Sequence, residues 1–161
     1  MIRIAVVGEI GSGKTFLAKL FGFPVFNADK EVAKIYKKNK KVYKKLSSKL
    51  SKFAFSFPIK KNEISNAIKN NSKNLKIVTN LIHPIVRKKM NKFLIKNRSK
   101  KAVVLDIPLY FENNLNKRKD IVIFIHAEKS LINRALNKRS KSNIKLLKKL
   151  GKLQKSLKMK K

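Results

Sequence analysis

The chain of 161 residues has no cysteine, no tryptophan, five glycines, four prolines and only eight acidic residues. Without cysteine it has neither a disulfide scaffold nor a thiolate metal site. No apolar segment is long enough for a membrane span or a secretory signal, so we expect a cytoplasmic protein. A chain of this length predicts one domain with a substantial hydrophobic core.

The shortage of acidic residues leaves a formal net charge of +34, set by 42 lysines and arginines. Clustered cations bind nucleic acids or anionic membranes by releasing counterions. Here most of the charge is lysine, spread along the chain among abundant asparagine and isoleucine, and these three residue types share A/T-rich codons. We therefore favour genome composition over a selected polyanion-binding surface, and expect no specific nucleic-acid or membrane partner.

One of the few glycine-rich segments carries the clearest motif. Gly8 to Thr15 reads G-E-I-G-S-G-K-T, which fits G-x-x-x-x-G-K-[ST] and follows an apolar run that indicates a buried strand. Glycine lets backbone N–H groups approach triphosphate oxygens at the start of a helix. Lys14 then reaches the terminal phosphates, and the Thr15 hydroxyl is placed to bind Mg²⁺. This segment predicts a phosphate-binding loop.

Short apolar runs alternate with helical or mixed stretches, which is the pattern of a parallel α/β sheet. Between the second and third runs lies a long lysine-rich and asparagine-rich insert with helical periodicity, which predicts a helical subdomain with a loop at 53–61. After the fourth run, two helices are expected at 128–137 and 142–158. The four expected strands are 2–7, 24–26, 102–105 and 121–125.

Two carboxylates follow expected strands, at the edge where parallel sheets bind ligands. Asp29 could accept a proton from an attacking hydroxyl or hold Mg²⁺ through water, or it could cap the following helix. Asp106 ends the third strand, where a second Mg²⁺ carboxylate or a turn residue is typical. No N-K-x-D follows the fourth strand, which disfavours a G protein.

The order of these segments resembles the dephospho-coenzyme A kinase family, a branch of the P-loop nucleotide kinases. The resemblance covers residues 2 to about 155. The segments that carry it are Gly8 to Thr15, Asn27-Ala28-Asp29, His83-Pro84, Leu105-Asp106-Ile107-Pro108-Leu109 with Phe111-Glu112, and Arg134 through Arg139 to Gln154.

The resemblance implies a three-layer α/β kinase with a parallel sheet that phosphorylates the ribose 3′-hydroxyl of dephospho-coenzyme A, using ATP and Mg²⁺. The core would comprise 1–29 and 102–126, with an acceptor-binding insert at 30–101 and a lid at 127–158. The implied ATP-binding residues are Gly8, Gly11, Ser12, Gly13, Lys14, Thr15 and Phe16, and the implied metal ligands are Thr15 and Asp106.

The resemblance also implies roles in the reaction. Asp29 matches the base toward the 3′-hydroxyl, and the cations that act on the transferred phosphoryl group are Lys14 and two lid arginines, Arg134 and Arg139. The acceptor would contact Asp29, His83, Pro108, Leu109 and Glu112. For His83 a structural role beside Pro84 is the alternative, and for Arg139 a solvated helix end.

Several positions depart from the family pattern. Asn27 stands where the family usually has a first aspartate, so one carboxylate and its Mg²⁺ role are lost. One extra residue lies between the lid arginines, so Lys138 could replace Arg139. Family members continue into a fifth strand and a last helix, whereas this chain stops at Lys161. We therefore expect a truncated sequence whose fourth strand is a sheet edge.

We expect a monomer with a small-molecule substrate. The alternative within the enzymes is another small-molecule or nucleotide kinase of the P-loop class. From a different class, the alternative is a basic binder of nucleic acid or anionic surfaces that keeps a degenerate nucleotide site.

Overall fold

A computed structural model of the chain describes residues 1–137 and divides it into two compact units. Unit 1 comprises Met1–Asn27 and the described residues from Leu94 onward, and it contains the sheet. Unit 2 comprises Ala28–Phe93 and is helical.

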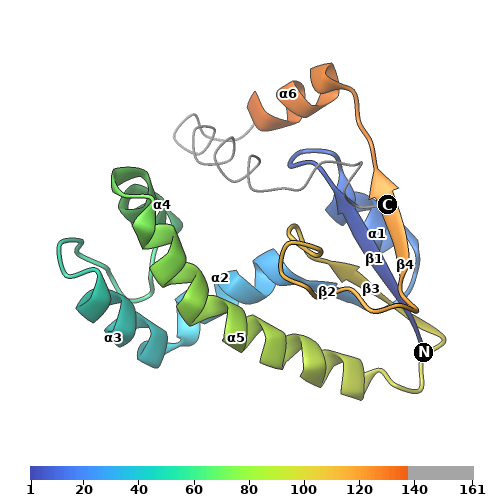
Figure 1. The fold of residues 1–161 in the computed structure, drawn as a ribbon, viewed down its shortest axis with the longest axis horizontal. Coiled ribbons are helices and arrows are strands. Elements are labelled where there is room, and N and C mark those ends of the chain that lie inside the picture. Colours follow the sequence, from blue (N-terminus) through green and yellow to red (C-terminus); the bar gives the residue numbers. More distant parts are fainter. Residues whose placement is uncertain (138–161) are drawn as a thin grey trace. The chain divides into compact units, whose positions relative to one another are not determined.

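Unit 1 is built on a four-stranded parallel sheet with the order β2-β3-β1-β4 (Figure 1). The prediction of a parallel α/β sheet is confirmed. β3 is buried along its whole length, as its continuous apolar run predicts, whereas β4 is an edge strand with exposed Ile121 and Val122. The strands are β1 (Ile2–Gly8), β2 (Val25–Asn27), β3 (Ala102–Asp106) and β4 (Ile121–Ile125).

Helix α1 (Lys14–Leu20) packs on one face of this sheet. Because strand side chains alternate between faces, Ile4 and Val6 of β1 point to the same side and pack with Ala18. Partly buried side chains complete this core, namely Leu17, Phe21, Phe23, Val25, Ile123 and Ile125. The core therefore fixes the phosphate-binding loop between β1 and α1.

Unit 2 contains α2 (Ala28–Lys38), α3 (Lys40–Lys49), α4 (Lys61–Asn70) and most of α5 (Lys73–Lys96) (Figure 1). Each helix has an apolar stripe, and the buried residues include Ile35, Val42, Leu46, Ile64, Ile68, Val78 and Ile82.

Asn39 separates α2 from α3. The lysine run at 37–45 is split between two helices at Asn39, whose side chain accepts a hydrogen bond from the backbone N–H of Val42 at 3.0 Å and so begins α3. Asparagine is a favoured residue at the N-cap position, directly before a helix, so this contact marks the start of α3. Pro84 lies inside α5.

The second strand is shifted by one residue from its expected position. It spans Val25–Asn27 rather than 24–26, because Pro24 has no N–H to donate and the register pairs Asn27 with Asp106. Helix α6 (Lys129–Asn137) agrees with the expected helix at 128–137. The expected helix at 142–158 lies outside the described residues. Among residues 1–137, no helix combines the length and apolar character that crossing a membrane requires.

Candidate active site

The loop between β1 and α1 depends on glycine at three points. Gly8, Gly11 and Gly13 have φ angles of 151°, 94° and 88°, which other residues rarely adopt. At Gly8 an added Cβ would lie 2.5 Å from the backbone oxygen of Ile125 and 3.0 Å from Ser12 Oγ. The close approach of β1 to β4 at this position therefore requires glycine.

Lys14 and Ser12 are buried in this loop, and both present polar atoms that an anionic ligand could use. Lys14 Nζ donates to the carbonyl oxygens of Gly8 at 3.0 Å and Glu9 at 2.5 Å. Ser12 Oγ is buried without a hydrogen-bond partner among the described residues. Buried polar groups normally have partners. A buried ammonium and an unpartnered hydroxyl in a glycine-rich loop fit a phosphate group.

Thr15, Asp106 and Asn27 meet at the carboxyl ends of the strands. Thr15 Oγ1 donates to Asp106 Oδ2 at 2.7 Å, and the side-chain amide of Asn27 donates to the same oxygen. Asp106 is only 3% exposed. The hydroxyl of the phosphate-binding loop is thereby connected to the last residues of β2 and β3.

Sequence reasoning missed the contact made by Asn27, which it treated only as a lost carboxylate. The structure pairs Asn27 with Asp106 in the β2–β3 register. The available signal was that both residues end neighbouring parallel strands, whose carboxyl ends share one edge of the sheet. An amide at position 27 donates a hydrogen bond to the Asp106 carboxylate instead of repelling it.

Asp29 lies in the first turn of α2, two residues along the chain from Asn27. It is the second residue of this helix. Its helix belongs to unit 2. A carboxylate in the first turn interacts favourably with the partial positive charge at this end of the helix.

His83 lies in the middle of α5, so it caps no helix end. Burial lowers the pKa of its imidazole, and the positive charge of Arg87 lowers it further. A histidine with a lowered pKa is neutral near pH 7 and has a ring nitrogen able to accept a hydrogen bond.

Pro108, Leu109 and Glu112 follow β3 in the same connection, and each is partly buried. Arg134 lies on α6 with an exposed side chain. Phe16 is 70% exposed on α1, directly after Thr15. Arg139 and its alternative Lys138 lie outside the described residues.

Residues 1–137 hold no group of three or more histidine, cysteine, aspartate or glutamate residues suited to a metal ion. Thr15 Oγ1 and Asp106 Oδ2 are in contact, and both oxygens are possible metal ligands. Mg²⁺ is commonly held by one or two protein oxygens together with phosphate oxygens and waters. The residues therefore fit Mg²⁺ bound with a nucleotide better than a metal held by protein alone.

Solved structures similar to this chain include the following two. A crystal structure of TT1252 from Thermus thermophilus matches with a TM-score of 0.76 and 23% identity, covering 99% of this chain and 83% of the other. A dephospho-CoA kinase from Campylobacter jejuni matches with a TM-score of 0.58 and 28% identity, covering 94% and 79%. The first likeness supports the fold alone.

Curated proteins named dephospho-CoA kinase are also similar. One from Bartonella henselae is 32% identical over 136 residues, covering 77% of this chain and 66% of the relative, and one from Wolbachia pipientis wMel is 29% identical over 142 residues, covering 85% and 73%. The chain thus spans slightly less than two thirds of the Bartonella relative. The family model described as dephospho-CoA kinase matches residues 2–160, so the chain belongs to the dephospho-CoA kinase family.

Proposed function

We propose that this chain transfers the γ-phosphoryl group of ATP to the ribose 3′-hydroxyl of dephospho-coenzyme A. The observation that carries the proposal is the contact between Thr15 of the phosphate-binding loop and the buried Asp106, beside the buried Lys14. Family membership supplies the reaction class and the acceptor. We also propose a cytoplasmic monomer, as the sequence led us to expect.

The nucleotide half of the site would lie in unit 1. Backbone N–H groups of the loop, Ser12 Oγ and Lys14 would hold the β- and γ-phosphates, with Lys14 exchanging its carbonyl partners for phosphate oxygens. Thr15 and Asp106 would hold Mg²⁺, which neutralises phosphate charge when it is bound. The exposed ring of Phe16 would border the nucleotide.

In the transfer step, the bond from the γ-phosphorus to the β–γ bridging oxygen breaks and a bond to the 3′-oxygen forms. Asp29 takes the hydroxyl proton, and the products are ADP and coenzyme A. Arg134, with Arg139 or Lys138, would neutralise charge that develops on the transferred group. Catalysis then depends on positioning and electrostatics rather than on a covalent intermediate.

The acceptor would contact Asp29, His83, Pro108, Leu109 and Glu112. The lowered pKa of His83 supports this role, because a neutral imidazole can accept a hydrogen bond from a ribose hydroxyl. Pro108 and Leu109 offer partly buried apolar contacts, and Glu112 offers a carboxylate.

Substitution of Asp29 tests the function and the base together. We expect Asp29→Asn to lower kcat with dephospho-coenzyme A by about 10²- to 10⁴-fold, with ATP affinity little changed, because only proton transfer is lost. The measurement is acceptor-dependent ADP release, with ATP binding followed separately.

Glu31→Gln is the matched control, since Glu31 lies in the same helical turn and forms ion pairs with Lys34 and Lys89. It should retain most of the turnover. A fully active Asp29→Asn enzyme would refute the base assignment, and the absence of acceptor-dependent turnover in the unmodified chain would refute the function.

A further inference from the structure

The connection between β3 and β4, residues 107–120, contains neither helix nor strand. Connections of this length without secondary structure are uncommon in compact units and are usually functional or disordered. This one has an ordered interior, because Tyr110 is only 1% exposed and is among the largest fully buried side chains of unit 1.

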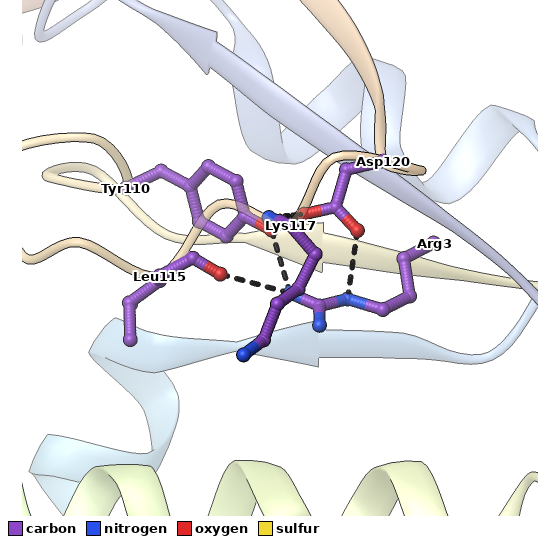
Figure 2. Close-up of polar contacts among 5 residues, drawn as sticks. All are labelled: Arg3, Tyr110, Leu115, Lys117 and Asp120. Carbon is purple, nitrogen blue, oxygen red and sulfur yellow. Dashed lines mark hydrogen bonds and ion pairs between the residues drawn. The ribbon is translucent and has the colours of Figure 1, made fainter.

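The hydroxyl of Tyr110 lies between an arginine and an aspartate (Figure 2). It accepts a hydrogen bond from Arg3 Nη2 at 2.7 Å and donates one to Asp120 Oδ2 at 2.5 Å. Arg3 Nε pairs with Asp120 Oδ1 at 3.1 Å, and Arg3 Nη2 also donates to the Leu115 carbonyl at 3.0 Å. The backbone N–H of Lys117 donates to Asp120 Oδ2 at 2.6 Å.

Further hydrogen bonds surround this largely buried ion pair. The side chains of Arg3 and Asp120 are 16% and 2% exposed. Desolvation of two charges is costly unless further hydrogen bonds complete both partners. Here the carboxylate forms an ion pair with the guanidinium and accepts hydrogen bonds from a hydroxyl and an amide, and such networks hold their members in one geometry.

The cluster holds the connection against the sheet face opposite α1. Ile4 and Val6 pack with α1, and side chains alternate along a strand, so Arg3 points to the other face. Backbone hydrogen bonds continue outward from the anchored tyrosine, from Leu115 N to the Tyr110 carbonyl and from Asn113 N to the Leu109 carbonyl, both at 3.1 Å.

Tyr110 stands between Leu109 and Glu112, two of the proposed acceptor contacts. We propose that Arg3, Tyr110 and Asp120, here called the loop anchor, are positioning residues that set the affinity for the acceptor by fixing residues 108–112. This inference rests on the proposed function. The loop anchor does not touch the reacting atoms, so its loss should act on acceptor binding and leave the nucleotide half of the site intact.

Steady-state kinetics of the full chain test the inference. We expect Tyr110→Phe to raise KM for dephospho-coenzyme A about fivefold to tenfold, with KM for ATP and kcat changing less than about twofold. Asp120→Asn should have a larger effect in the same direction. The double variant should resemble Asp120→Asn alone, because both changes break one network. Tyr43→Phe removes a tyrosine hydroxyl from unit 2 instead, and should change neither KM value nor kcat.

Amide hydrogen exchange gives a second readout of the same variants. Faster exchange at 108–115 in Tyr110→Phe, with β1 and β3 unchanged, would support the anchor. Unchanged exchange, an unchanged acceptor KM, or equal increases in KM for ATP and acceptor would overturn it. If the unmodified chain shows no acceptor-dependent turnover, the proposed function fails and this inference fails with it. If only this inference is wrong, the unmodified chain still shows acceptor-dependent turnover.

Discussion

The two units use their scarce carboxylates differently. Unit 1 places Asp106 and Asp120 in its interior, each with several hydrogen-bond donors, whereas unit 2 uses Glu31 and Glu63 near its surface to join or cap helices. A buried carboxylate constrains its neighbours, because losing one donor leaves an uncompensated charge. In a chain with so few acidic residues, the two buried ones therefore lie at the proposed nucleotide site, in the case of Asp106, and at the end of the β3–β4 connection, in the case of Asp120.

The units also differ in what organises their backbones. In unit 1 the sheet register and glycine conformations fix the loop, with no tolerance for a side chain at Gly8. In unit 2 short helices begin at local signals. The Asn39 side chain caps α3, and at the start of α4 the Glu63 carboxylate accepts a hydrogen bond from the backbone N–H of Lys60. Substitutions should therefore affect unit 1 cooperatively and unit 2 locally.

Gly8→Ala should give the largest difference between the units. Its Cβ would meet the Ile125 backbone oxygen at 2.5 Å, so we expect a loss of about 3 kcal/mol or more in the free energy of unfolding. Chemical denaturation of the whole chain measures this loss of stability, and amide hydrogen exchange should be faster in β1 and β4. Gly22→Ala is the control, because it also has positive φ but no atom within 4 Å, and should cost about 1 kcal/mol.

Asn27→Asp should give an intermediate effect that depends on Mg²⁺. A second carboxylate beside Asp106 removes a donor and adds like-charge repulsion, so we expect a loss of about 1–3 kcal/mol in the absence of metal. Added Mg²⁺ should restore part of that stability, which thermal melting without nucleotide measures. Asn91→Asp, an exposed change in unit 2, controls for adding negative charge to a protein of net charge +34. An Mg²⁺ response equal in both variants would contradict the proposed site.

Acid should affect unit 2 by a smaller amount. Burial raises the pKa of Glu31 and Glu63, but hydrogen bonds and nearby lysines outweigh it, so both lie below the ordinary value of 4.5. A carboxyl group with a lowered folded pKa contributes stability that is present above its unfolded pKa and lost as pH falls below it. The melting temperature should therefore decrease as the pH is lowered below about 4.5, and this decrease should be smaller in Glu63→Gln. Glu128→Gln, at an exposed side chain in unit 1, controls for the removal of one carboxyl group.

Much of unit 1 could be predicted because its signals are local. Four apolar runs and one motif predicted the strands, and three of the four agree closely with the structure. The second strand was displaced by one residue, since a three-residue strand beside Pro24 has too little pattern to place its ends. In unit 2 the helical character was predictable, but the break at Asn39 depended on a capping contact that periodicity does not report.

The sequence alone determined the phosphate-binding motif, the α/β class and family membership, because each depends on residue types at fixed short spacing. Only the tertiary structure decided which distant residues meet. Asn27 and Asp106 are 79 positions apart, and Arg3 and Leu115 are 112 apart, yet both pairs are hydrogen-bonded. Such contacts depend on the register of the whole parallel sheet and on the path of the β3–β4 connection, which no local pattern encodes.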